Sequence, residues 1–150
     1  MIGPIGPSNR GRRGAAGAAG ATGAAAPYIG VVDKPTTDTG ATLAFTGRAI
    51  YTNTSGAART LTSVSAWFVT TVAFNATNHA SVDFTVNDAA GTSGTVTSIT
   101  CASVDFTARV PRITSGLSIN VDAGGSVMVA ISKPGGGVTL PVGAFQVTLT

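Results

Sequence analysis

The side chains with the chemistry to act as catalysts are few in this sequence. His79 is its one histidine, so a zinc site built from two histidines, including the HExxH type, is excluded. His79 could belong to a Ser-His-Asp triad on paper, but the sequence contains no G-x-S-x-G elbow. The run Asn78-His79-Ala80 is typical of a turn that enters a strand. We therefore expect no catalytic role for His79.

Paired carboxylates are the other catalytic arrangement to consider, because glycoside hydrolysis needs two of them. The candidates are Asp83, Asp88 and Asp105. Asp83 and Asp105 lie between apolar neighbours in runs that alternate apolar and polar residues. This pattern favours carboxylates on the solvent side of a strand. The sequence therefore indicates a protein that is not an enzyme and has no metal site.

Two patterns bear on cofactors and sugars. Residues 133–139 combine lysine and glycines as phosphate-binding loops do, but they lack the Gly-Lys-Ser/Thr order and precede a strand instead of a helix. We expect a hairpin turn there and no cofactor. Trp67, Tyr28 and Tyr51 could form an aromatic platform for a sugar, although a single tryptophan in a sandwich lies more often in the core or an interface.

The composition limits the class of protein. Its 150 residues suit one domain with an appendage, and only 10% of them are charged. The net charge of +3 comes from Arg10, Arg12 and Arg13, because the basic and acidic residues balance from Lys34 onward. A body without basic patches interleaved with aromatics argues against nucleic acid as a partner. The lone Cys101 excludes an internal disulfide, and no run of about 18 apolar residues indicates a membrane partner.

The hydrophobic pattern predicts an all-β fold. Thr and Val are abundant, Glu is absent, and short alternating runs are separated by Gly, Asn and Pro turns. The expected strands are residues 41–50, 60–70, 81–87, 95–101, 104–110, 117–122, 127–131 and 144–150. We predict an antiparallel sandwich of about eight strands, jelly-roll-like, over residues 28–150, preceded by an extended Gly/Ala-rich arm over residues 1–27.

Three segments of the body carry a resemblance to a known family. They are residues 48–56 (RAIYTNTSG), 106–111 (FTARVP) and 136–149 (GGVTLPVGAFQVTL). With the glycine-rich arm, the sequence resembles the capsid decoration, or cement, proteins and head fibres of tailed phages. The resemblance implies a homotrimeric sandwich that is made in the host cytoplasm, binds the major capsid protein on the outer surface of the head and stabilises it.

Two other classes remain open at this stage. A tail-fibre or spike tip that binds host-surface glycans would use the same fold, and it would be expected to expose aromatic residues at its loop tips. A depolymerase would also be compatible with the fold, but the sequence lacks the acid and base residues that it would need. The resemblance itself brings no catalytic residues.

The arm repeats glycine at every third position from Gly11 to Gly23, as collagen does. Its other positions hold Arg, Ala and Thr without proline, so a free triple helix is not expected. A short bundle of three arms tied to a trimeric head remains an alternative. We favour a single arm that lies along the capsid, where the arginines bind acidic partners. The predicted anchoring residues are Arg10, Arg12, Arg13, Gly14, Gly17, Gly20 and Gly23.

Overall fold

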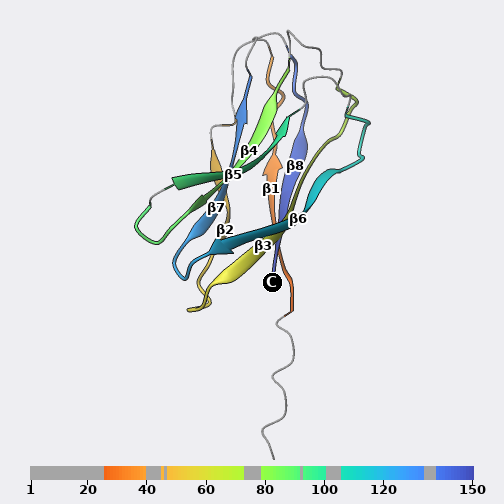
Figure 1. Cartoon of the computed structure of the whole chain (residues 1–150). Helices are drawn as coiled ribbons and strands as arrows, with labels where there is room; N and C mark the ends of the chain where they lie inside the picture. The colour runs from red at the N-terminus through yellow and green to blue at the C-terminus, as the bar shows by residue number, and fades with distance from the viewer. Residues whose placement is uncertain are drawn as a thin grey trace, which may run out of the picture.

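The structure is a computed structural model (Figure 1), and it describes residues 26–39, 45, 47–72, 79–91, 93–100, 106–133 and 138–150. All of the predicted anchoring residues of the arm lie outside this set, as do Cys101 and Asp105. The described residues contain eight strands and no helix. The strands are β1 (Tyr28–Lys34), β2 (Arg48–Thr52), β3 (Arg59–Phe68), β4 (Ser81–Asn87), β5 (Ser93–Thr100), β6 (Arg112–Val121), β7 (Ser126–Ser132) and β8 (Gly143–Leu149).

The strands form two four-stranded sheets, in the orders β1-β8-β3-β6 and β2-β7-β4-β5. Every pairing within them is antiparallel. The first strand pairs with the last, the second with the seventh, the third with the sixth and the fourth with the fifth. This nesting is what results when one long antiparallel hairpin is rolled up, and it defines a jelly roll. The predicted eight-stranded antiparallel sandwich is confirmed.

The core lies between the two sheets and is built from inward-facing alternate residues. On β3, Val64, Ala66 and Phe68 alternate toward the core and are all buried. Phe68 packs edge-on against Phe106 and Phe145, with ring centroids 5.0 and 6.4 Å away. Such edge-to-face packing uses the quadrupoles of the rings in addition to the hydrophobic area that they bury.

One predicted strand is wrong. Among residues 104–110, the described part holds an isolated bridge between Phe106 and Val72, followed by a turn in which the Val110 N–H donates to the carbonyl of Thr107. Arg109 adopts a φ of 60°, in the left-handed region, and this reverses the chain before Pro111. The alternating pattern of this run therefore reports burial of Phe106 and not an extended strand.

Three other boundaries differ from the predictions. Strand β1 was not predicted, because Gly30 interrupts its short apolar run; a Cβ at Gly30 would come within 2.6 Å of the Ile50 carbonyl oxygen. Of the strand expected over 41–50, residues 41–44 and 46 lie outside the described part of the chain, and β2 begins at Arg48. Strand β6 starts five residues earlier than expected. Gly116, at φ 75°, lies where the pairing of β6 with β3 shifts register, and this bulge lets β6 continue as one strand.

Candidate interaction face

The outward side of the β1-β8-β3-β6 sheet forms rows of side chains that cross all four strands. One row joins Val31, Gln146, Ser65 and Ile113 through their pairing registers. The neighbouring rows are Ile29, Thr148, Ser63 and Ser115 on one side, and Asp33, Ala144 and Trp67 on the other. We call these residues the outer face. Of these described residues, only Asp33 carries a charge.

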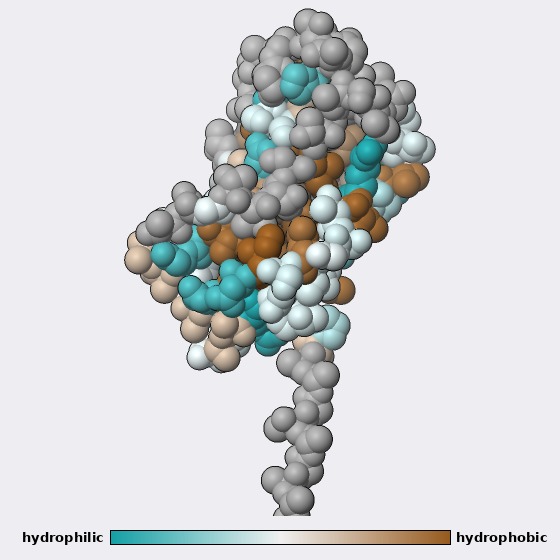
Figure 2. All heavy atoms as spheres, in the orientation of Figure 1, coloured by the Kyte–Doolittle hydropathy of each residue, from teal (hydrophilic) through white to brown (hydrophobic). Residues whose placement is uncertain are grey.

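The outer face also exposes apolar side chains at both of its edges. Ile29 and Val31 on β1 are each 57% exposed, and Ile113 on β6 is 65% exposed. The other large apolar residues with exposed side chains in the described structure are Tyr28, the first residue of β1, and Val110, which precedes β6. Figure 2 shows hydrophobic atoms reaching the surface near the start of β6. A sheet surface with this composition is typical of an interface.

None of the large apolar residues with exposed side chains in the described structure lies on the opposite sheet. Asp83 on β4 is half-buried, and its carboxylate accepts hydrogen bonds from Ser81 Oγ at 2.9 Å and Ser132 Oγ at 3.1 Å. These two hydrogen bonds satisfy both oxygens of the carboxylate, and the one from Ser132 joins β4 to β7. The contrast between the two sheets makes the outer face the candidate site.

A pocket of about 230 Å³ adjoins the outer face at the end of β3. Trp67, Val69, Arg109 and Pro111 line it. The Arg109 N–H donates to the carbonyl of Phe68 at 2.8 Å, which holds the turn against the end of β3. The walls are apolar and the rim carries a guanidinium, so the pocket suits a partner group with an apolar body and polar edges.

Asn53 is the centre of a buried hydrogen-bond network that sequence reasoning missed. Its Nδ2 donates to the carbonyls of Ala57, Val121 and Asp122 at 2.8–3.0 Å. Its Oδ1 accepts from the Tyr51 hydroxyl and from the backbone N–H and hydroxyl of Ser55. The YTNTSG string therefore fixes the β2–β3 loop against the β6–β7 turn. Its role is structural, and the only sequence signal was an asparagine two residues after a tyrosine, within a turn-like Asn-Thr-Ser-Gly run.

A buried ion pair lies at the end of β1, where Lys34 is the last residue of the strand. Lys34 Nζ lies 3.2 Å from Asp38 Oδ2, and both side chains are fully buried. The ammonium also donates to the carbonyls of Thr36 and Leu140. Burial lowers the pKa of nearby Lys133, an effect that Asp38 opposes and Lys34 reinforces. These charges satisfy one another and present no site for a ligand.

The catalytic candidates are not brought together. His79 Nδ1 is buried without a hydrogen-bond partner in the described structure, whereas a triad requires a carboxylate at that atom. The Asp88 carboxylate accepts from the Ala90 N–H and caps a turn. In the described part of the chain, no three His, Cys, Asp or Glu side chains lie together as metal ligands. No helix among those residues could span a membrane.

The aromatic candidates are also separated. The Tyr51 side chain is buried, and its ring lies 4.6 Å from that of Tyr28, centroid to centroid, at one end of the sandwich. Trp67 is half-buried at the other end of the sheet, beside its own pocket. They form no common platform. Lys133 follows β7, and residues 134–137 lie outside the described part of the chain. The hairpin turn expected there is wrong, because β7 and β8 belong to different sheets and do not pair.

The chain was compared with protein families, with curated proteins and with solved structures. No protein-family model and no curated protein matches the chain. Among solved structures, infectious bursal disease virus of the Gt strain matches with a TM-score of 0.41 and 12% identity, over 82% of this chain and 32% of that chain. The VP2 subviral particle of that virus gives 0.36 and 11%, over 81% and 32%. This chain thus spans about a third of the length of those chains.

These solved structures are of a virus and of a virus-derived particle. Sequence identities of 11–12% speak only to the arrangement of strands. TM-scores this low transfer neither an activity nor a partner from those proteins to this chain.

Proposed function

We propose that the protein is a structural component of a phage virion and not an enzyme. In this proposal it is a capsid decoration protein or head fibre that binds the head as a homotrimer and stabilises it. The observation that carries the proposal is the outer face, where apolar side chains at both edges flank uncharged polar ones. Jelly rolls are a common fold of viral capsid proteins. The resemblance of the three segments to phage virion proteins agrees with this function.

The mechanism would be mechanical. Copies of the chain cover one another's outer faces, and the arm, through Arg10, Arg12 and Arg13, reaches the major capsid protein. Contacts that exist only on the assembled shell stabilise that shell by mass action. Many weak contacts made by linked copies act together through avidity, so each arm needs only modest affinity.

Self-association through the outer face is tested by sedimentation equilibrium of the full chain. We expect the wild-type protein to sediment as a trimer, and Ile113→Lys and Val31→Lys to shift the mass toward the monomer, because each places a charge in an apolar contact. Thr52→Lys, at an exposed position on the other sheet, is the matched control and should remain a trimer. Unchanged trimers for both outer-face variants would contradict the proposed interface.

The arm is tested by co-sedimentation with empty heads. Replacing Arg10, Arg12 and Arg13 by glutamine should leave the trimer intact and abolish binding, since the charge-assisted contacts to acidic groups are lost. Deleting residues 1–26 should have the same effect. A truncated protein that still occupies the heads fully would show that the arm is not the anchor.

A second candidate function is favoured by one observation, the pocket beside Trp67. A half-buried aromatic wall with a nearby guanidinium offers a sugar ring both an apolar face and a polar edge, so a tail-fibre tip that binds host glycans is the alternative. A glycan array compares the wild type with Trp67→Ala. Many copies on the head would favour decoration, whereas a few copies at the tail would favour receptor binding.

A further inference from the structure

The outer face ends at two sheet edges that carry opposite charges. In the order β1-β8-β3-β6, β1 and β6 are the edge strands, each hydrogen-bonded to one neighbour. The β1 edge exposes Ile29 and Val31, and the exposed carboxylate of Asp33 follows them on the same side. The β6 edge exposes Ile113 and, just before the strand begins, the guanidinium of Arg109 beside its apolar pocket. Each edge therefore combines an apolar surface with one charge.

Asp33 and Arg109 lie too far apart to meet within one chain. The pairing registers join Asp33 through Ala144 to Trp67, and Trp67 lines the pocket together with Arg109. Arg109 precedes β6, the fourth strand of the sheet, so three strand spacings of about 4.8 Å place the two edges about 14 Å apart. Neither side chain belongs to an ion pair among the residues that the structure describes. Both charges therefore face outward, toward another molecule.

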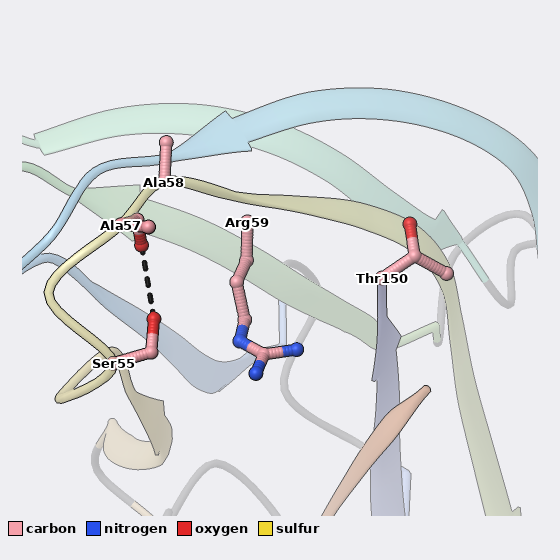
Figure 3. A pocket seen from close by; sticks show the side chains of 5 residues that line it. All are labelled: Ser55, Ala57, Ala58, Arg59 and Thr150. Carbon is pink, nitrogen blue, oxygen red and sulfur yellow. Dashed lines mark hydrogen bonds between the residues drawn. The ribbon is translucent and has the colours of Figure 1, made fainter. Parts of the chain in front are cut away.

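The other basic side chains of the described structure are engaged elsewhere. They are Lys34, Arg48, Arg59, Arg112 and Lys133. The two lysines lie near the buried carboxylate of Asp38. Arg48 and Arg112 lie over aromatic rings, 5.6 and 5.5 Å from the ring centroids. Arg59, the first residue of β3, lies at the other end of that strand, where its guanidinium points into the pocket drawn in Figure 3. Arg109 is thus the described cation that suits a partner carboxylate at the outer face.

We propose that the β1 edge of one copy contacts the β6 edge of the next, with Asp33 paired to Arg109 across the contact. The inference rests on the function proposed above, since it specifies how copies associate through the outer face. Strands β1 and β6 run antiparallel to each other, because three antiparallel pairings separate them. A second copy whose β1 lies beside β6 therefore continues the alternation of the sheet. In that arrangement Val31 lies against Ile113, because these two residues share a row of the outer face.

A contact between two different edges is heterologous, and such contacts form a closed ring where the rotation between copies permits it. A ring of three uses each β1 edge and each β6 edge once, so it covers the exposed apolar side chains at both edges. A two-fold contact between equal edges would bring equal charges together, which is unfavourable. The opposite charges of the two edges therefore favour the heterologous arrangement.

The test is a charge exchange, measured by sedimentation equilibrium of the full chain. Asp33→Arg and Arg109→Asp each place like charges at the contact, and each should weaken association roughly tenfold. Aspartate tolerates the left-handed φ of residue 109, so Arg109→Asp should keep the turn. The double variant Asp33→Arg, Arg109→Asp has opposite charges again and should associate as the wild type does.

Asp122→Arg is the matched control, because it makes the same change of charge at an exposed position beyond the other end of β6. It should leave the mass of the assembly unchanged. Added sodium chloride should strengthen the association of the two single variants and weaken that of the wild type, since salt screens repulsion and attraction alike.

Two results would overturn the pairing of the edges. One is association of the single variants at the strength of the wild type, and the other is a double variant that associates no better than the single ones. If Ile113→Lys still shifts the mass toward the monomer in that case, the outer face remains the interface and only the proposed pairing of its edges fails. A wild-type protein that is monomeric would contradict the proposed function itself.

Discussion

Replacing Asn53 by alanine removes the largest set of side-chain hydrogen bonds at one residue in the described structure. The Asn53 side chain is 1% exposed. Its loss leaves the buried carbonyl of Val121, formerly 2.9 Å from Nδ2, and the buried hydroxyl of Tyr51, formerly 3.2 Å from Oδ1, without these partners. The substitution therefore acts through groups that water cannot easily reach.

The magnitude follows from the two groups left unpaired. Each buried polar group without a partner destabilises the fold by about 1–3 kcal/mol. Together we expect Asn53→Ala to lower the free energy of unfolding by about 2–6 kcal/mol. A typical domain has only about 5–15 kcal/mol in total, so this one change should remove a large part of the stability.

Urea unfolding followed by the fluorescence of Trp67, the single tryptophan, measures this free energy. Thr54→Ala, at the exposed neighbouring position, is the control and should stay within about 0.5 kcal/mol of the wild type. Asn53→Asp retains the acceptor oxygen but loses both donor hydrogens, so it should also be strongly destabilising. A loss below about 1 kcal/mol for Asn53→Ala would refute the view that this network is buried and mutually satisfied.

Three further changes test other parts of the fold by the same urea assay. Asp38→Asn leaves the Lys34 ammonium buried without its carboxylate and should lower the free energy of unfolding by about 3–5 kcal/mol. The double variant Lys34→Met, Asp38→Leu removes both charges and should restore much of that loss. Equal losses in the two variants would argue against a buried pair. Arg109→Gly should raise stability by about 1 kcal/mol, because glycine adopts the φ of 60° without strain, and a loss would mean that the arginine side chain matters more. Burial lowers the pKa of Lys133 in the folded protein below the 10.5 of the unfolded chain. Between the folded and the unfolded pKa the unfolded chain binds more protons, so the free energy of unfolding should rise with pH in that range. Lys133→Met should remove this dependence on pH.

The sequence predicted those strands whose alternation coincides with burial. In β4, the strict pattern over residues 81–87 matches Ser81–Asn87, and in β7 the apolar run matches a strand paired on both sides. The run before Pro111 failed because alternation cannot register the left-handed Arg109. Strand β1 was missed because Gly30 looks like a turn residue, although the close approach of β2 requires it.

The candidate site was harder to predict than the fold. A sequence pattern cannot say which apolar residues face outward, so Ile29, Val31 and Ile113 were indistinguishable from core residues until the sheet registers were known. Trp67 was expected in the core or an interface, and it lies half-buried beside a pocket. The role of Asn53 depends on the carbonyls of Val121 and Asp122, which are distant from it in sequence. The anchoring role of the arm stays a prediction.

The nested pairing of the strands affects how the protein can be synthesised. Strand β8, the last of the eight to leave the ribosome, occupies a central place between β1 and β3. Until it emerges, the sheet that carries the outer face lacks its interior strand, and β1 has no neighbour within that sheet. The nascent chain therefore cannot complete this surface before β8 has left the ribosome, and a subunit becomes competent to associate only after that point. A chain that stops short of Gly143 would lose the middle of a sheet instead of an edge.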